Sequence, residues 1–207
     1  MRTRVKICGI TRIKDAERAV ALGVDAIGLV FYAKSNRAVS LPNAMQITRA
    51  IGPFVTTVGL FLDATQQYVK QVIDAVPLDL LQFHGDECPA DCGVYGKPYI
   101  KAVPMGAETD VVLYARNYPD ACGFLLDSHV PGGAGGLGTP FDWDKVPANL
   151  GRPLILAGGL NARNIAEAIG RIRPYAVDVS SGIEFDKGIK DEKKMAEFMK
   201  EVRRVDC

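Results

Sequence analysis

The stretch Val5-Lys6-Ile7-Cys8-Gly9 is a short β-rich run that ends in a thiol and a glycine. Side chains alternate across a strand, so Lys6 and Cys8 share one face while Val5 and Ile7 share the other. The apolar pair suits packing against covering helices, which turns Lys6 and Cys8 toward the interior of a parallel barrel. Parallel α/β proteins carry out their chemistry at the carboxyl ends of such strands. Cys8 is therefore the first candidate for a functional residue.

Similar apolar runs recur along the chain, separated by segments of helical length. Strands are predicted at 4–8, 26–30, 54–60, 79–82, 99–103, 123–126, 154–157 and 176–179. Helical spacing is present at 13–22, 42–51, 65–76, 161–169 and 191–205. Leu22-Gly23 and Ile169-Gly170 have the form of helix ends. Continuous β-rich runs alternating with helices predict a single (β/α)8 TIM barrel over 1–207.

A doubly wound open sheet is the alternative architecture. It would be expected to carry a glycine fingerprint, G-x-G-x-x-G, after its first strand, and this chain has none there. No stretch rich in proline, glycine and serine divides the chain as a linker would. These observations favour the barrel.

Composition narrows the classes of function. The chain has 207 residues, 48% hydrophobic and 24% charged, with a net charge of +1, so no basic excess points to nucleic acid or to an anionic membrane. The absence of a secretory signal and of an apolar run long enough to span a bilayer predicts a cytoplasmic protein. Five cysteines are too scattered for a disulfide framework. Cys88 and Cys92 lack a second Cys/His pair, so no metal site is expected.

Asp127 repeats the pattern seen at Cys8. It ends the run Gly123-Phe124-Leu125-Leu126-Asp127, and the glycine-dense segment 131–138 follows it. Long loops inside compact domains are usually functional, so we expect a mobile active-site loop there. Taken alone, Cys8 could be a small buried hydrophobic residue and Asp127 a turn cap. Together, at strand ends that converge on one mouth, they could serve as a base and an acid facing one substrate.

Two glycine-containing turns follow the seventh and eighth strands. They contain Gly158 and Gly159 in the first turn and Ser180, Ser181 and Gly182 in the second. Barrels commonly build a phosphate site from these two loops, because glycine lets backbone N–H groups approach the anion. Any tight turn favours glycine, so either pair alone is weak evidence. Both pairs in the expected places predict a phosphate site.

Two further residues complete the predicted site, and two others form a predicted structural pair. Arg37, in the loop after the second strand, could hold a substrate carboxylate in a bidentate clamp, although most loop arginines are only solvated. His84 ends the fourth strand and is either a hydrogen-bonded strand-end histidine or a substrate contact. Lys6 and Asp178 lie on the first and eighth strands, so barrel closure predicts that they meet inside it.

The chain resembles the phosphoribosylanthranilate isomerases over nearly its whole length. The matching motifs are KICGIT at 6–11, SNR at 35–37, QFHGDE at 82–87, LDS at 126–128, FDW at 141–143, AGGLN at 157–161 and DVSSGIE at 178–184. One departure lies at 135–138, where this chain has Gly-Gly-Leu-Gly and the family often has Gly-Gly-Thr-Gly. That difference concerns the loop and leaves Cys8 and Asp127 in place.

The resemblance implies an aldose–ketose isomerase of tryptophan biosynthesis that needs no cofactor. It implies that Asp127 is the general acid and Cys8 the general base of an Amadori rearrangement of N-(5'-phosphoribosyl)anthranilate. Arg37 would hold the anthranilate carboxylate, and the loops at 158–159 and 180–182 the phosphate. A thiol must have its pKa lowered to act as a base, and Lys6 is one source of the positive potential required. The expected state is a monomer or homodimer.

Two rival functions remain open at this point. The histidine-pathway aminoimidazole isomerase uses carboxylates at both positions, and Cys8 in place of an acid argues against it. The other rival is a catalytically silent phosphate-binding barrel, which a turnover assay distinguishes from an isomerase.

Overall fold

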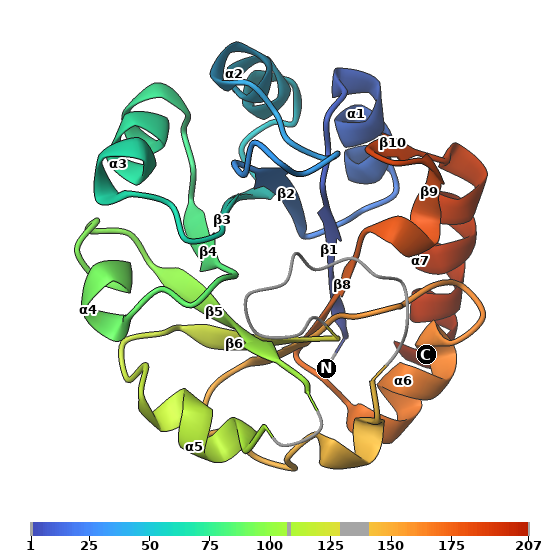
Figure 1. Ribbon diagram of the computed structural model, residues 1–207. Helices are drawn as coiled ribbons and strands as arrows, with labels where there is room; N and C mark the ends of the chain where they lie inside the picture. Colours follow the sequence, from blue (N-terminus) through green and yellow to red (C-terminus); the bar gives the residue numbers. More distant parts are fainter. Residues whose placement is uncertain (1, 107–108, 129–140, 207) are drawn as a thin grey trace.

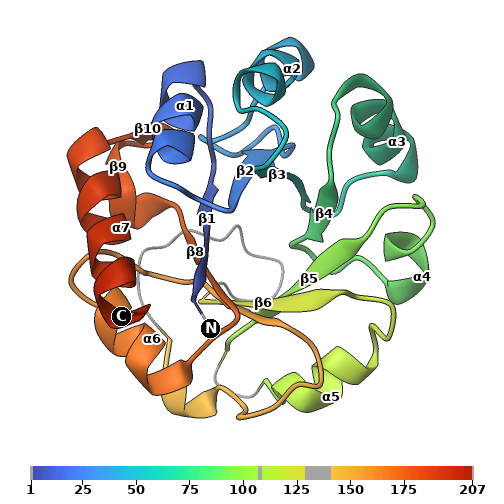
Figure 2. The same ribbon diagram turned by 180° about the vertical axis from the view of Figure 1, so that it is seen from behind.

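The eight predicted strands form one closed parallel barrel, and the predicted (β/α)8 fold is confirmed. The computed structural model describes residues 2–106, 109–128 and 141–206. The strands pair in chain order from β1 to β8, and β8 pairs with β1 to close the barrel. Figure 1 shows the helices as an outer ring around these strands, and Figure 2 shows the same ring from behind.

The barrel strands are β1 (Arg4–Cys8), β2 (Ala26–Val30), β3 (Thr56–Phe61), β4 (Leu80–Phe83), β5 (Tyr99–Pro104), β6 (Gly123–Asp127), β7 (Leu154–Leu156) and β8 (Ala176–Val179). The α-helices are α1 (Ile13–Ala21), α2 (Leu41–Ala50), α3 (Gln66–Ala75), α4 (Pro89–Cys92), α5 (Val111–Arg116), α6 (Ile165–Ile172) and α7 (Glu192–Asp206). Two 3-10 helices, η1 (Trp143–Lys145) and η2 (Ser181–Ile183), and a hairpin of β9 (Glu184–Asp186) and β10 (Ile189–Lys190) complete the described elements. None of these helices combines the length and the apolar composition needed to cross a bilayer.

Several predicted boundaries were wrong. The helix predicted at 161–169 begins later, at Ile165, because the Asn164 side chain accepts a hydrogen bond from the Asn161 backbone N–H at 2.8 Å and holds these residues in a turn. Gly170 does not end that helix, which continues to Ile172 and stops at Arg173 in the left-handed region, φ 52°. The glycine-dense segment 131–138, predicted as a mobile loop, lies outside the described residues.

Two further differences concern β3 and α5. The strand predicted at 54–60 begins at Thr56, and Phe54, which is 96% exposed, lies before it. α5 was not singled out by sequence periodicity because it is short, and the Asp110 side chain that caps it accepts from the Leu113 backbone N–H at 2.9 Å.

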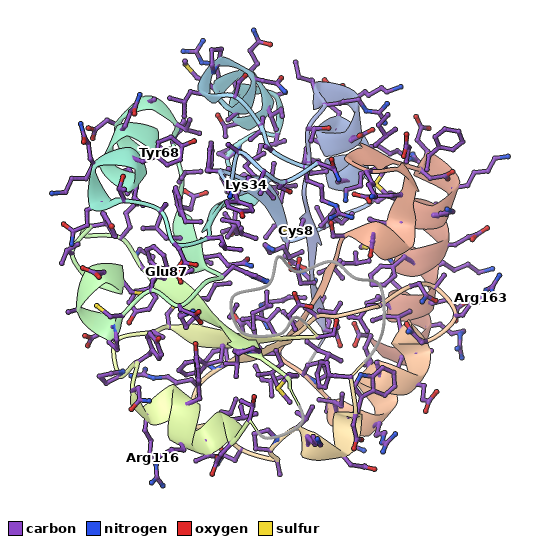
Figure 3. All side chains as sticks on the ribbon, in the orientation of Figure 1. Cys8, Lys34, Tyr68, Glu87, Arg116 and Arg163 are labelled. Atoms are coloured by element: carbon purple, nitrogen blue, oxygen red, sulfur yellow. The ribbon has the colours of Figure 1, made fainter. Side chains whose placement is uncertain are left out.

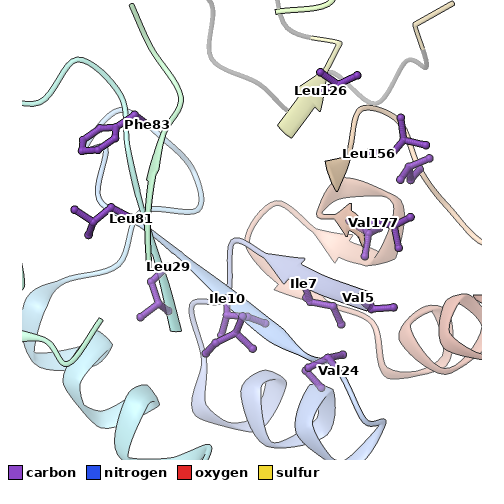
Figure 4. Packing of buried hydrophobic residues seen from close by; sticks show 14 of the residues in the cluster. Val5, Ile7, Ile10, Val24, Leu29, Leu81, Phe83, Leu126, Leu156 and Val177 are labelled. Carbon is purple, nitrogen blue, oxygen red and sulfur yellow. The ribbon is translucent and has the colours of Figure 1, made fainter. Parts of the chain in front are cut away.

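The apolar core has two layers, and the alternation along each strand separates them. The larger layer packs the outside of the barrel against the helices and contains Val5 and Ile7, which Figure 4 shows beside residues of other strands. The smaller layer fills the barrel interior and contains Leu125 and Ile155. Cys8 belongs to neither; it packs in a separate cluster with Val30 and Leu60. The predicted division of β1 into a helix-facing and an interior face is confirmed.

Candidate active site

One cavity opens at the carboxyl ends of the barrel strands and collects the predicted residues. Its lining includes Cys8, Arg37, His84, Asp127, Gly158, Gly159, Ser180 and Ser181. Figure 3 shows Cys8 at the centre of the ribbon, whereas Arg116 and Arg163 lie at the periphery. Gly182 does not line the cavity. A Cβ at Gly182 would lie 1.9 Å from the Leu160 carbonyl oxygen, so this glycine lets the turn after β8 pack directly on the turn after β7.

Cys8 is the last residue of β1 and is 6% exposed. Gly28 on the paired strand β2 makes room for it, since a Cβ there would lie 2.8 Å from the Cys8 Sγ and 3.1 Å from the Lys6 Cε. Burial raises the pKa of the Cys8 thiol above its ordinary value because a thiolate loses water there. The charges of Lys6 and Lys190 oppose this shift, and Asp178 adds to it. Lys6 therefore supplies the positive potential expected at the thiol, but burial outweighs it.

Lys6 and Asp178 form a buried ion pair inside the barrel, as predicted. They are register partners on β1 and β8, and the Lys6 Nζ lies 2.9 Å from the Asp178 Oδ1. Burial alone would lower the pKa of Lys6, but the charges of Asp178 and Cys8 outweigh it and raise that pKa. The lysine therefore stays charged directly beneath the thiol.

Asp127 ends β6 and is held from two sides. Its Oδ1 accepts a hydrogen bond from the Ser128 backbone N–H at 2.8 Å, and its Oδ2 lies 3.1 Å from the His84 Nε2. The other ring nitrogen of His84, Nδ1, lies 3.0 Å from the Gln82 Nε2. His84 is thus a hydrogen-bonded strand-end histidine that also lines the cavity. Asp127 belongs to β6 and is also connected to β4 by the contacts that run through His84 to Gln82.

Arg37 lies against a carboxylate instead of being solvated. Its Nε and Nη2 donate to the two oxygens of Glu184, each at 2.8 Å, and the charge-assisted pair raises the pKa of Arg37. Glu184 therefore already occupies the Nε and Nη2 edge of the predicted clamp. Sequence reasoning quoted Glu184 within a motif but assigned it no role.

Lys190 was missed altogether. It belongs to β10, in a stretch rich in lysine and acidic residues that suggests a solvated surface. Its side chain is instead buried, and its Nζ lies 2.9 Å from the Glu184 Oε1 and 3.2 Å from the Ser180 carbonyl oxygen. The one available signal was its place in the strand that directly follows the turn of the hairpin.

The two glycine turns lie side by side at the mouth of the barrel. Gly158 has φ +77°, and a Cβ there would lie 2.7 Å from the Ser128 backbone nitrogen and 3.1 Å from the Asp127 Oδ1. The turn after β7 can therefore approach the carboxylate only because this residue is glycine. In the turn after β8, the Ser180 hydroxyl donates to the Cys8 carbonyl oxygen at 3.0 Å. Each turn thus contacts one of the two candidate reactive residues.

Cys88, Cys92 and Cys122 stand apart from this cavity. The Cys88 thiol donates to Asp91 at 2.9 Å, and burial raises the pKa of Cys92 to about 12. In the described ranges, no group of three or more histidine, cysteine or acidic side chains has an arrangement that could hold a metal ion.

A closed parallel barrel with a thiol, a carboxylate and two glycine turns at one mouth is the arrangement of a (β/α)8-barrel enzyme acting on a small anionic substrate. The model of the N-(5'-phosphoribosyl)anthranilate (PRA) isomerase family matches residues 5–201. The chain belongs to this family.

Individual relatives agree with that assignment. The N-(5'-phosphoribosyl)anthranilate isomerase of Pseudomonas fluorescens is 58% identical over 201 residues, covering 97% of this chain and 96% of the relative. That of Pseudomonas paraeruginosa is 56% identical over 200 residues, covering 97% and 95%. The crystal structure of phosphoribosyl anthranilate isomerase from Thermus thermophilus has a TM-score of 0.87 at 36% identity, covering 98% of this chain and 100% of that one.

A further solved structure is similar to this chain and contains a bound ligand. It is a phosphoribosyl anthranilate isomerase in complex with reduced 1-(o-carboxyphenylamino)-1-deoxyribulose 5-phosphate, with a TM-score of 0.83 at 37% identity, covering 98% of this chain and 99% of that one.

Proposed function

We propose that this protein catalyses the Amadori rearrangement of N-(5'-phosphoribosyl)anthranilate to 1-(2-carboxyphenylamino)-1-deoxyribulose 5-phosphate in tryptophan biosynthesis. The observation that carries the proposal is the single cavity lined by Cys8, Asp127 and both glycine turns. A thiol at the end of β1 and a carboxylate at the end of β6 supply a base and an acid without any cofactor. The reaction is an aldose–ketose isomerisation.

Asp127 is the general acid in this proposal. It gives its proton to the furanose ring oxygen, the C1–O bond breaks, and the nitrogen lone pair forms the iminium. Donation requires a protonated carboxyl, and the amide of Gln82 offers a means to hold one. Its Oε1 is buried without a hydrogen-bond partner in the described part of the chain, whereas its Nε2 contacts His84.

The direction of these hydrogen bonds follows the orientation of the Gln82 amide. When the Nε2 group donates to His84 Nδ1, the ring hydrogen sits on Nε2 and faces Asp127, which suits the carboxylate. Rotating the amide by half a turn presents Oε1 instead, so that Nδ1 carries the hydrogen and Nε2 accepts one from protonated Asp127. The pair Gln82 and His84 therefore accommodates Asp127 both before and after it gives up its proton.

Cys8 is the general base. Its thiolate removes the C2 proton, the C2–H electron pair forms the C1=C2 bond, and the iminium electrons return to nitrogen, giving an enolamine that tautomerises to the ketone. The raised pKa of Cys8 keeps the thiol largely protonated before substrate binds. The iminium formed by Asp127 then acidifies the C2 proton and adds positive charge beside the sulfur. Lys6 provides a second positive charge close to the thiolate.

The substrate's two anions account for the rest of the site. Arg37 would bind the anthranilate carboxylate with the Nη1 edge that Glu184 leaves open. Backbone groups of Gly158, Gly159 and the turn 180–182 would bind the phosphate, as the loops after β7 and β8 do in many barrels. His84 would contact the sugar while it orients Asp127.

We also propose that residues 1–207 act as one catalytic domain in the cytoplasm, as a monomer or homodimer. A dimeric phosphoribosylanthranilate isomerase, from which monomers have been generated, is known from Thermotoga maritima and shares 35% identity at a TM-score of 0.82. Size-exclusion chromatography coupled to light scattering measures the oligomeric state of this protein directly.

A turnover assay tests the function. The substrate is itself fluorescent, so purified protein should extinguish its signal at a rate proportional to enzyme concentration. Saturable binding of substrate without turnover would instead identify a phosphate-binding barrel. Conversion of the histidine-pathway aminoimidazole substrate in preference to this one would favour the rival isomerase.

A further inference from the structure

The buried ammonium of Lys190 touches both ends of the proposed substrate site. Lys190 is 3% exposed, and its Nζ lies 2.9 Å from the Glu184 Oε1, 3.2 Å from the Ser180 carbonyl oxygen and 3.3 Å from the Ser180 Oγ. Glu184 in turn accepts both hydrogen bonds from Arg37. One side chain from β10 therefore connects the arginine of the carboxylate end to the serine of the phosphate end.

The backbone of Lys190 is itself fixed from outside the site. Its N–H donates to the Asp15 Oδ2 at 3.2 Å, and its carbonyl oxygen accepts from the Arg12 Nη2 at 3.2 Å. Arg12 and Asp15 are joined to each other by two hydrogen bonds of 2.8 and 2.7 Å at the start of α1. The lysine thus reaches inward from an anchored strand, with little freedom to change its position.

Glu184 and Arg37 are equally constrained. Burial would raise the pKa of Glu184, but the hydrogen bonds from Arg37 and the charge of Lys190 outweigh it and lower that pKa, so the carboxylate is ionised between two cations. On the far side of the guanidinium stem, a Cβ at Gly9 would lie 2.6 Å from the Arg37 Cδ. The arginine therefore packs against the backbone next to Cys8, and its free edge has a defined direction.

We propose that Lys190 is a positioning residue that sets the spacing between the carboxylate-binding and phosphate-binding ends of the site. Acting through Glu184 it orients Arg37, and acting directly it orients the turn at Ser180. It would thereby select substrates that carry a carboxylate and a phosphate at one fixed separation. This inference rests on the proposed function, in which Arg37 binds the substrate carboxylate.

The alternative is that Lys190 only stabilises the fold. A purely structural lysine would lower stability when replaced, and it would weaken ligands with and without a carboxylate by the same factor. A positioning lysine predicts a selective loss, because the phosphate and sugar contacts survive in part while the carboxylate contact is misplaced. Displacing a reacting group by about 1 Å can lower a reaction rate about 100-fold. A loss of about tenfold in the contribution of the substrate carboxylate to binding is therefore a modest expectation.

The experiment compares two ligands on three proteins. The ligands are reduced 1-(o-carboxyphenylamino)-1-deoxyribulose 5-phosphate and its phenylamino counterpart without the ring carboxylate. The proteins are wild type, Lys190→Met, and the control Lys194→Met, which removes an exposed lysine whose Nζ donates to the backbone oxygen of Glu184 at 2.7 Å and touches neither carboxylate oxygen of that residue in the described contacts. Calorimetric titration gives Kd for each combination, and steady-state kinetics separates KM from kcat.

In wild type and in Lys194→Met, removal of the ring carboxylate should weaken binding strongly and by the same factor. In Lys190→Met that factor should shrink about tenfold, with KM rising more than kcat falls. An undiminished factor in a folded Lys190→Met protein overturns the inference while leaving the proposed function intact. Indifference of the wild-type protein to the ring carboxylate would instead overturn the role proposed for Arg37.

A second variant covers the case in which Lys190→Met does not fold. Glu184→Gln keeps the shape of the link and removes its charge, and it should shrink the same carboxylate factor. If Glu184→Gln leaves that factor unchanged, or if both variants unfold, the network is structural and the inference is wrong.

Discussion

The two halves of the site hold their reactive groups by different means. Around the thiol of Cys8 lie buried charges from three strands, those of Lys6, Asp178 and Lys190. The carboxylate of Asp127 accepts a hydrogen bond from the Ser128 backbone N–H and lies within hydrogen-bond distance of the His84 ring. The pKa of Cys8 is thus a balance between burial and nearby charges. Whether Asp127 holds its proton depends, in the proposed mechanism, on which atoms of Gln82 and His84 donate and which accept.

The surroundings of Cys8, here called the base half, and those of Asp127, the acid half, also come from different parts of the chain. The charges around Cys8 come from β1 and β8, which meet when the barrel closes, and from β10 of the separate hairpin. The acid half is built from the ends of β4 and β6, with Gln82 and His84 two residues apart on one strand face. Perturbing one half should therefore leave a signature different from that of the other.

The largest expected effect comes from removing either reactive group. Cys8→Ala and Asp127→Ala should each lower kcat by about 10²–10⁴-fold, because each removes one proton-transfer step. Stopped-flow or steady-state loss of substrate fluorescence measures kcat, and circular dichroism checks that the fold persists. A near-normal kcat in either variant would remove that residue from the mechanism.

Breaking the ion pair below the thiol should be next in size. Asp178→Ala leaves the Lys6 ammonium buried without its partner and should cost about 3–5 kcal/mol in the free energy of unfolding, measured by urea denaturation. The double variant Lys6→Met/Asp178→Leu should recover most of that loss, because it removes both charges. Arg204→Ala, which breaks an exposed pair with Glu201, is the matched control and should have far less effect. Wild-type stability in Asp178→Ala would refute the structural role of the pair.

Substitutions around Asp127 should lower kcat and leave the free energy of unfolding nearly unchanged, because they leave no charge buried without a partner. His84→Phe should lower kcat by about 10–100-fold, the size commonly found when a partner that orients a reactive group is lost. Gln82→Leu should have a smaller effect in the same direction, since His84 stays in contact with Asp127. Kinetics at saturating substrate provide the measurement. An effect on KM alone would show that His84 binds substrate without orienting the acid.

The smallest effect is a displacement of the pH profile. The raised pKa of Cys8 and the need for a protonated Asp127 together predict a bell-shaped dependence of kcat/KM on pH. The limb set by the thiol should lie on the alkaline side of the ordinary thiol value of 9.0. In Cys8→Asp that alkaline limb should disappear, whereas His84→Phe should keep it, because His84 belongs to the other half. A wild-type profile with no limb on the alkaline side of the ordinary thiol value of 9.0 would contradict the raised pKa.

Much of this architecture could be read from local pattern. Alternation of apolar runs with helical segments predicted each strand of the barrel and the inward face of Lys6 and Cys8. Boundaries failed where side chains overrode periodicity, as at Asn161 and Asn164, which form a turn ahead of α6. α5 has only six residues, too few to show helical spacing clearly.

The sequence predicted the residues that lie at strand ends and in the loops after them, and it did not predict the buried contacts behind them. Cys8, Asp127, Arg37 and His84 line the same cavity, as expected when the strand ends of a parallel barrel converge on one mouth. Lys190 was not found, because a lysine in a charged hairpin has the sequence pattern of a solvated residue and its burial depends on elements far along the chain.

By itself the sequence determined the barrel, its register of interior and exterior faces, and the placement of a thiol and a carboxylate at the mouth, since these follow from strand periodicity and chain order. Only the tertiary structure decided the sign of the pKa shift at Cys8 and the occupancy of Arg37 by Glu184. Burial and ion pairing depend on distances between residues far apart in the chain. The pairing of Arg37 with Glu184 across 147 positions is one such case.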